Sequence, residues 1–190
     1  MDFNDFKNIV KNTRCVRRFK PCEIKKDDLI QLIDLARNVS SAKNMQVLKY
    51  IPIVDENIKD EVYKPLIWAS HLNNWNQNEN EKPSAYILIL NDTSIDGFAQ
   101  IDSGIAMQTI MLGANLKGYG ACMLASIDKV AYKKLFNLDS HLEPMFIIAF
   151  GKKDEHIELV EQKGDESNYY RDEKGNHYVP KKRLEDIIIG

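Results

Sequence analysis

The stretch that decides the fold is Asp102 to Met123, with the sequence DSGIAMQTIMLGANLKGYGACM. Up to Leu116, apolar and small residues occupy nearly every position, and only Gln108 and Asn115 interrupt them after Asp102. A helix that is apolar on all sides must be buried on all sides. The sequence therefore predicts a helix that lies at the centre of one chain or is partly buried by a second copy, and both alternatives stay open.

The sequence also predicts where this helix ends. Lys117 and Gly118 place a cation in the last turn and a glycine after it, which is a common way to end a helix. Tyr119 to Leu124 then predicts a short buried strand. Within the helix, Gly104 and Gly113 are small enough for a neighbouring backbone to approach closely, so we expect close-packed neighbours at both.

Length and composition indicate a single soluble domain over residues 1–190, because 44% apolar and 28% charged residues are ordinary values for a globular protein. The net charge of −2 gives no basic excess with which to neutralise nucleic-acid phosphates. No stretch approaches the roughly 20 apolar residues of a membrane-spanning helix. We therefore expect neither a nucleic-acid partner nor a membrane partner.

The cysteines and histidines predict a cytoplasmic protein without a metal site. The three cysteines form no CxxC pair, and an odd number without pairing suits a reducing compartment better than a disulfide framework. The four histidines are scattered and lack the spacing of metal ligands.

Predicted helices and strands mix along the chain without strict βαβ alternation, which indicates the α+β class. Met145 to Phe150 has the pattern of a central strand, and Pro52 places the strand Leu48 to Val54 at a sheet edge. Residues 172–176 predict a hairpin turn that contains Gly175. A helix over residues 128–136 should turn Val130 inward, and Leu184 to Ile189 predicts a last strand.

Residues 63–80 contain both tryptophans, Trp68 and Trp75, among many Asn and Gln residues. This composition favours a surface excursion that could act as a lid. The alternative is that the tryptophans are simply exposed or serve only in packing.

Familiar catalytic motifs are missing: the sequence contains no GxSxG, no GxxxxGK[ST] and no GxGxxG. Gly118-Tyr119-Gly120 follows a predicted helix and precedes a predicted strand, which is the reverse of a dinucleotide-binding turn. Cys15 and Cys122 could be nucleophiles, but neither has a histidine nearby in sequence, and buried structural thiols are the commoner case.

Three polar segments remain as candidate binding elements. Arg14 and Arg17 could hold an anion, or they could belong to a solvated basic turn. The small polar residues 40–46 could approach a planar ligand closely, or they could simply connect a helix to a strand. Lys181 and Arg183 share one side of an extended segment, where they could bind a phosphate or protect a strand edge from aggregation.

In this order, the segments resemble motifs of the nitroreductase family of FMN-dependent oxidoreductases. Residues 13–19, TRCVRRF, are similar to R-R-S-x-R-x-F, and residues 40–48, SSAKNMQVL, to P-S-A-x-N-x-Q-P-W. Asp102-Ser103-Gly104, followed by the buried helix and Leu116 to Gly120, resembles the family's D-x-G and L-G-x-G pattern. Residues 169–172, YYRD, and 179–183, VPKKR, resemble the tail of some small members.

The resemblance implies an α-β-α sandwich with a mostly antiparallel central sheet and helices on both faces. It also implies a homodimer with two FMN molecules in its interface, each held by both subunits. The C-terminal strand would be exchanged between the subunits, so that residues 180–190 form a dimer-crossing tail.

The resemblance also assigns the site. Arg14, Cys15 and Arg17 would contact the flavin ring and the ribityl-phosphate, and Lys181 and Arg183 would hold the phosphate. Backbone N–H groups near Ala125 and Ser126 would face flavin N5. The residues contributed by the partner chain would be Ser40, Ser41, Ala42, Asn44 and Gln46.

The implied function is ping-pong transfer of electrons from NAD(P)H, through FMN, to a nitroaromatic, a quinone or a similar planar acceptor. No catalytic side chain is expected, because the flavin carries the chemistry. Thr13 and Cys15 stand where Arg and Ser are usual, and Val47 and Leu48 replace Pro and Trp, so the acceptor class stays open. The alternatives are a non-catalytic FMN-binding dimer, as a flavin store or electron relay, and a helical-dimer structural protein without a cofactor.

Overall fold

The structure, a computed structural model, describes residues 1–70, 72, 75 and 77–190. The chain divides into two compact units, Met1–Lys153 and Asp154–Gly190, and each is described by itself. The elements of the first unit are α1 (Phe3–Asn12), β1 (Phe19–Lys20), α2 (Lys26–Arg37), the 3-10 helix η1 (Ala42–Asn44), β2 (Leu48–Ile53), α3 (Glu56–Tyr63), the 3-10 helix η2 (Glu79–Glu81), β3 (Ala85–Asp92), α4 (Ala99–Leu116), β4 (Gly120–Leu124), α5 (Lys129–Leu135) and β5 (Leu142–Lys153).

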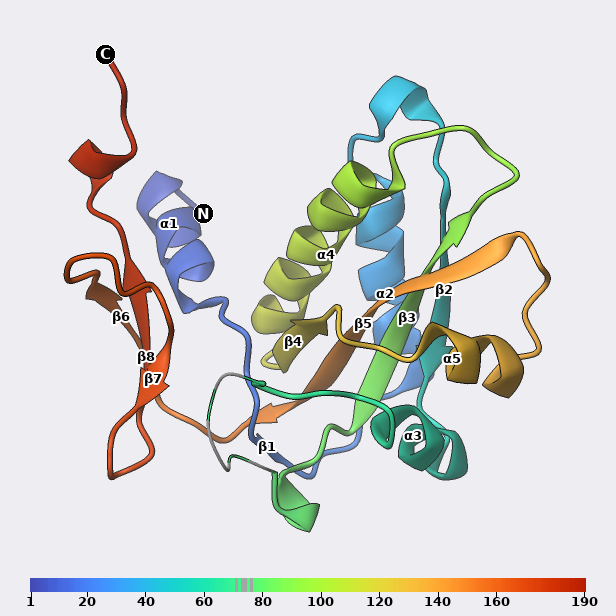
Figure 1. The fold of residues 1–190 in the computed structure, drawn as a ribbon, viewed down its shortest axis with the longest axis horizontal. Coiled ribbons are helices and arrows are strands. Elements are labelled where there is room, and N and C mark those ends of the chain that lie inside the picture. The colour runs from blue at the N-terminus through green and yellow to red at the C-terminus, as the bar shows by residue number, and fades with distance from the viewer. Residues whose placement is uncertain (71, 73–74, 76) are drawn as a thin grey trace. The chain divides into compact units, whose positions relative to one another are not determined.

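The first unit is built on an antiparallel sheet whose longest strand is β5 (Figure 1). One side of β5 pairs with β3, and β2 pairs with the outer side of β3. The other side of β5 pairs with β4 and then with β1. Pro52 lies in β2 at the edge of the sheet, as its missing N–H group requires, so that prediction is confirmed.

Successive residues of β3 point to opposite faces of the sheet, and both faces are covered by helices. Ala85, Ile87 and Ile89 pack in one cluster with α2 and α4. Tyr86, Leu88 and Leu90 pack in a second cluster with α3 and α5. A strand covered on both faces needs a continuous apolar run, which explains the sequence of β3. The α+β prediction, with an antiparallel sheet and helices on both faces, is confirmed.

Helix α4 is buried on one side only within this chain. Ala106, Ile110 and Ala114 are fully buried, whereas Ile101 and Leu116 are 59% and 66% exposed. Gly113 faces the side chains of α2, as expected, but a Cβ atom at Gly104 would meet nothing within 4 Å. The predicted close neighbour of Gly104 is therefore absent from the described residues of this chain.

The predicted orientation of the helix before β5 is wrong at Val130, which is 79% exposed. Tyr132 points inward instead and is fully buried, and its hydroxyl donates a hydrogen bond to the Val62 carbonyl at 2.7 Å. Asp128 caps the helix by accepting from the Ala131 N–H at 2.9 Å, and this sets which residues face the core.

Part of the predicted lid contributes to the core. Trp68 is half-buried, packs against the cluster that contains Val62 and Leu66, and lies near the Tyr63 ring. This favours the packing alternative for Trp68. Four residues of the same segment lie outside the described residues: His71, Asn73, Asn74 and Asn76.

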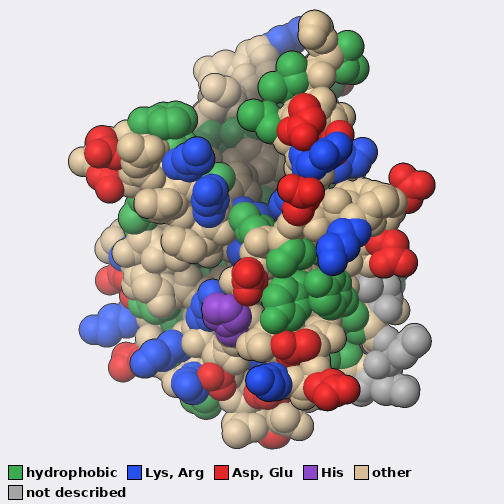
Figure 2. Space-filling model, turned by 90° about the vertical axis from the view of Figure 1, so that its left-hand side faces the viewer, with side chains coloured by type: hydrophobic (Ala, Val, Ile, Leu, Met, Phe, Trp, Pro, Cys, Tyr) green, Lys and Arg blue, Asp and Glu red, His purple; other side chains and the backbone are tan. Residues whose placement is uncertain are grey.

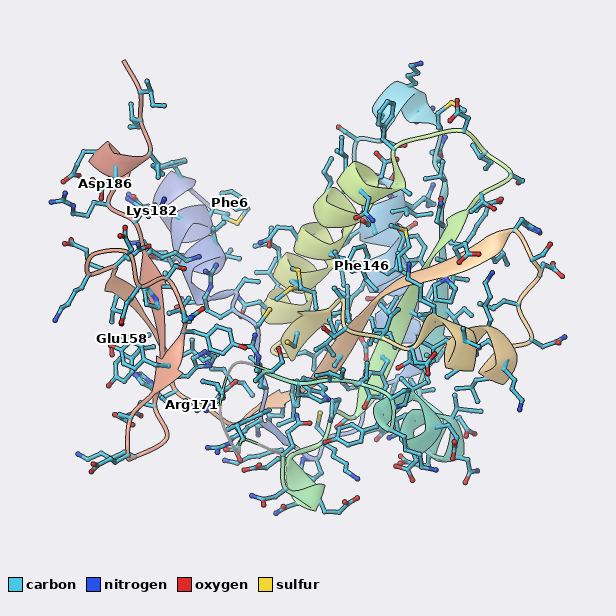
Figure 3. The ribbon with its side chains drawn as sticks, in the orientation of Figure 1. Phe6, Phe146, Glu158, Arg171, Lys182 and Asp186 are labelled. Carbon is cyan, nitrogen blue, oxygen red and sulfur yellow. The ribbon has the colours of Figure 1, made fainter. Side chains whose placement is uncertain are left out.

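The second unit contains β6 (Ile157–Glu161), β7 (Tyr170–Arg171), β8 (His177–Lys181) and the 3-10 helix η3 (Leu184–Asp186). Strand β8 pairs antiparallel with β7 across a turn in which Gly175 has a φ of 81°, so the predicted hairpin is confirmed. Strand β6 pairs parallel with β8. The buried Glu155 carboxylate forms an ion pair with Arg171, which is labelled in Figure 3.

The predicted last strand, Leu184 to Ile189, is wrong for the single chain. Leu184–Asp186 forms η3, and Ile187 and Ile188 stay about 60% exposed, at 60% and 61%. The Arg183 guanidinium reaches Asp186 three residues later, which favours a turn. A strand also needs a neighbour for its backbone hydrogen bonds, and no strand of the described residues pairs with this segment.

The contact between β1 and β5 gives a stability test. A Cβ atom at Gly151 would lie 2.7 Å from Cδ1 and 2.8 Å from Cβ of Phe19, which is fully buried. We expect Gly151→Ala to lower the free energy of unfolding by about 1–3 kcal/mol, because the sheet must shift to make room. Urea denaturation measures this. Lys152→Ala, at the exposed next position, should change it by less than about 0.5 kcal/mol; equal effects would contradict the overpacking argument.

Candidate functional site

The loop of residues 40–46 is fastened to α4 by the carboxylate of Asp102. This side chain is buried, and it accepts hydrogen bonds from Ser41 Oγ at 2.6 Å and from the Ala42 N–H at 3.0 Å. The Gln46 N–H in turn donates to Ser41 Oγ at 3.0 Å. Asp102 lies in the first turn of α4, where the helix dipole favours a negative charge. The carboxylate therefore holds the start of the loop directly, and the end of the loop is attached to Ser41.

The loop backbone is strained. Lys43, Asn44 and Gln46 have φ values of 52°, 55° and 52°, in the left-handed region that residues with a Cβ atom seldom adopt. Such conformations persist only where the surroundings impose them. Within the loop, the Asn44 N–H donates to the Ser41 carbonyl at 2.8 Å and the Met45 N–H to the Ala42 carbonyl at 3.1 Å, and Asp102 anchors Ser41 and Ala42.

A cavity of about 460 Å³ lies beside the loop. This volume is within the range of small-molecule sites, about 300–1,000 Å³. Burial, and then the charge of Asp102, raise the pKa of Tyr50 in the cavity wall to about 12. The polar side chains of the wall are Arg37, Ser40, Ser41, Gln46, Lys49, Tyr50 and Asp102.

The segment of Arg14, Cys15 and Arg17 runs beside β4. Cys15 forms a parallel bridge with Ala121, and the Val16 N–H donates to the Ala121 carbonyl at 2.9 Å. Arg14 donates to the carbonyls of Thr13 at 2.6 Å and Val10 at 2.7 Å, so it closes the C-terminal end of α1. Burial lowers the pKa of Arg14.

Arg17 and the residues after β4 complete this side of the sheet. Arg17 donates to the Cys15 carbonyl at 3.3 Å. Ala125 and Ser126 are exposed, and the Ser126 carbonyl accepts from the Ile67 N–H at 3.3 Å. Among the described residues the Ser126 N–H has no hydrogen-bond partner, so it can donate to a ligand.

The two groups of predicted residues lie at opposite ends of α4. The loop of residues 40–46 touches Asp102, whereas Arg14 lines a small cavity with Met111, Asn115 and Gly118. Asn115 lies thirteen positions after Asp102, which is roughly 20 Å along a helix. Figure 1 shows η1 and β4 at these two ends. One chain therefore does not bring the loop of residues 40–46 to Arg14, Cys15 and Arg17.

The last two predicted residues belong to the second unit. Lys181 ends β8 and is exposed. Arg183 is also exposed, and its Nε lies 3.2 Å from Asp186 Oδ2. This hydrogen bond raises the pKa of Arg183 and lowers the pKa of Asp186. The positive charge of Lys182 lowers the pKa of Asp186 further (Figure 3). The tail thus presents cations partly neutralised by its own carboxylates.

Other kinds of site find no support in the described part of the chain. Its His, Cys, Asp and Glu residues form no group of three or more that could hold a metal ion. None of its helices has the length and apolarity needed to cross a membrane. Figure 2 shows acidic and basic side chains interspersed over the face drawn there.

Sequence reasoning missed two contacts. It read Asp102 only as part of a motif, although an acidic residue at the start of an otherwise apolar helix is itself a signal for a buried partner. It also treated Cys15 and Cys122 separately, and nothing in the local sequence indicates that they meet.

The chain is similar to a known protein family and to proteins of two bacteria. The nitroreductase family model matches residues 10–152. A Bacillus subtilis protein classed as an NAD(P)H nitroreductase, MhqN, is 23% identical over 183 residues, which covers 78% of this chain and 89% of that protein. An NADPH-dependent oxidoreductase of Staphylococcus saprophyticus is 25% identical over 158 residues, covering 76% of this chain and 63% of that protein.

Solved structures share the fold. The Bacillus subtilis nitroreductase homologue ydfN aligns over 100% of both chains with a TM-score of 0.70 and 19% identity. An FMN-dependent nitroreductase from Clostridium difficile aligns over 78% of this chain and 87% of its own, with a TM-score of 0.63 and 20% identity. At such identities these likenesses establish the fold alone.

The Asp102 contacts predict a loosened loop in Asp102→Asn, because an amide replaces one acceptor oxygen with a donor group that faces other donors. We expect faster amide hydrogen exchange in residues 41–46 and a loss of about 1–3 kcal/mol of stability. Hydrogen exchange with mass spectrometry measures the first effect. Asp96→Asn, at an exposed position just before α4, is the control; unchanged exchange in Asp102→Asn would refute the role of the carboxylate.

Proposed function

Because this chain belongs to the nitroreductase family, we propose that it is an FMN-dependent oxidoreductase that passes electrons from NAD(P)H to a small planar acceptor such as a nitroaromatic or a quinone. The observation that carries the proposal is the pair of binding segments held in place around α4. One runs beside β4, and the other is the loop fixed by Asp102. Both coincide with segments that resemble the family's flavin-binding motifs.

The chemistry of the donor groups fits FMN. The exposed Ser126 N–H can donate to a ring nitrogen, and the small residues Ser40, Ser41 and Ala42 allow a planar ring to approach. Lys181 and Arg183 carry positive charge suited to a phosphate, and Arg17 adds charge beside β4. Arg14 supports this wall by closing α1, in addition to any contact with the ligand.

We propose a homodimer in which the loop of residues 40–46 serves the site of the partner. The roughly 20 Å between the two groups in one chain supports this, since a second copy can supply what one chain keeps apart. The exposed apolar residues Ile101, Ile105 and Leu116 on α4 offer an area that a second α4 could cover. The apolar tail, Ile187 to Ile189, could cross to the partner in the same dimer.

When bound, FMN would supply the two-electron carrier between NAD(P)H and the acceptor. The residues of the chain orient the ring and hold the phosphate. The cations Arg14 and Arg17 stabilise negative charge beside β4. The loop, fixed by Asp102 before any ligand arrives, forms one wall and restricts the entry of water. No side chain needs to act as an acid or a base.

Flavin uptake and turnover test the proposal. We expect the purified protein to take up FMN and show visible flavin absorbance, to bleach with NADH or NADPH, and to regain colour when a nitroaromatic or quinone is added. Absorbance spectroscopy in an anaerobic cuvette measures each step. Failure to bind FMN would refute the proposal. Binding without bleaching by either nucleotide would instead support a flavin store or an electron relay.

The phosphate assignment has its own test. We expect Arg183→Ala to weaken FMN binding about 10- to 100-fold, because the phosphate loses a charged hydrogen-bond donor. Titration with FMN, followed by quenching of flavin fluorescence, measures the dissociation constant. Lys174→Ala removes a cation from the hairpin turn of the same unit and should leave it unchanged; equal effects of the two variants would count against a specific role for Arg183.

A further inference from the structure

Two cysteines that are distant in sequence meet beside β4. Cys15 forms a backbone bridge with Ala121, the residue before Cys122. The side chain of Cys15 packs against the cluster that contains Cys122. The Cys122 thiol forms a hydrogen bond with the Cys15 sulfur. The pair therefore results from the fold and is not a sequence motif.

The surroundings of Cys15 favour its thiolate. The hydrogen bond from Cys122, the charges of Arg17 and Arg14 and the Met123 N–H outweigh burial, and together they lower the pKa of Cys15 to about 6. A thiolate is the nucleophilic form of cysteine, and a low pKa with cationic neighbours is typical of reactive thiols.

The two thiols differ in access. Cys15 is partly exposed, whereas Cys122 is fully buried behind it. A small reagent from solvent would therefore meet Cys15 first, with Cys122 already in contact on the protein side. This is the arrangement of a primary reactive thiol next to a second thiol that can close a disulfide.

We propose that Cys15 and Cys122 form a reversible redox pair that a hydroperoxide oxidises to an intramolecular disulfide. In the first step the Cys15 thiolate attacks the peroxide O–O bond, which gives a sulfenic acid and an alkoxide or hydroxide. In the second step the Cys122 sulfur attacks the Cys15 sulfur, its proton is released, and the sulfenic oxygen leaves as water. With hydrogen peroxide, two thiols and one H₂O₂ give one disulfide and two waters.

A disulfide of about 2.0 Å requires the two sulfurs to be neighbours. Cys122 is the side-chain hydrogen-bond partner of Cys15, so this requirement is met. The backbone bridge between Cys15 and Ala121 holds the Cys15 segment against β4. A thiol reductant would restore the pair.

Oxidation would change the basic segment. The disulfide removes the negative charge of the thiolate next to Arg14 and Arg17, and it ties residues 14–17 covalently to β4. The inference requires no flavin, and disulfide formation between Cys15 and Cys122 is measured without reference to FMN binding.

The remaining cysteine provides the control. The Cys22 Sγ lies 3.7 Å from Ser84 Oγ, and Cys22 is partly exposed like Cys15. Among the described residues, its hydrogen-bond partner is Ser84 and not a cysteine. Reagents can reach Cys22, but no thiol is in hydrogen-bond contact with it in the described part of the chain.

The experiment treats the full-length protein, and the variants Cys15→Ser, Cys122→Ser and Cys22→Ser, with a small excess of hydrogen peroxide. Free thiols are then alkylated and the peptides are mapped by mass spectrometry without reduction. We expect a peptide linking Cys15 to Cys122 in the wild type and in Cys22→Ser, together with its loss after treatment with dithiothreitol. Cys122→Ser should instead give a sulfenic acid at Cys15 that dimedone traps.

A second measurement follows the rate of alkylation of Cys15 by iodoacetamide as a function of pH. We expect the half-maximal rate near pH 6 in the wild type and a higher midpoint in Cys122→Ala, which removes the hydrogen bond that lowers the pKa of Cys15 most. No Cys15–Cys122 peptide, a disulfide that involves Cys22, a disulfide between chains, or oxidation of Cys15 no faster than that of Cys22 would each overturn the proposal.

Discussion

The structure depends on the burial of α4. Its apolar surface is wider than the sheet and the neighbouring helices α1 and α2 can cover, so one chain buries Ile110 and Ala114 but leaves Ile101 and Leu116 in solvent. Each fully buried aliphatic side chain contributes about 1.5–3 kcal/mol, which makes this exposed area unfavourable in a single chain. The same helix sets the distance between the two candidate binding segments, because they contact its opposite ends. The packing of the core and the distance between the two candidate binding segments therefore both depend on α4.

The sequence was most informative where a local pattern has one physical meaning. The apolar run of β3 requires cover on both faces, and the structure provides a helix pair on each. Pro52 cannot donate to a ladder and so belongs at an edge, and Gly175 can adopt the positive φ of a hairpin turn. These features need no knowledge of distant residues, and all of them agree with the structure.

The sequence was least informative where a distant contact decides. Tyr132 turns inward because Val62, 70 residues away, offers a carbonyl to its hydroxyl, and the rotation exposes Val130. The tail does not form a strand because pairing needs a partner that periodicity cannot supply. Among the predicted site residues, the position of the Arg14 to Arg17 segment beside β4 and the hydrogen bond from Ser41 to Asp102 both depend on residues far away in the sequence.

The strained loop after α2 has a consequence for affinity. A flexible loop must lose backbone entropy when a ligand orders it, about 1–2 kcal/mol per residue. In this chain that entropy is already lost during folding, since Lys43, Asn44 and Gln46 already adopt left-handed conformations and Asp102 anchors the start of the loop. The free energy of folding therefore already includes the cost of ordering the loop. A ligand that fits the loop binds with little further loss of backbone entropy.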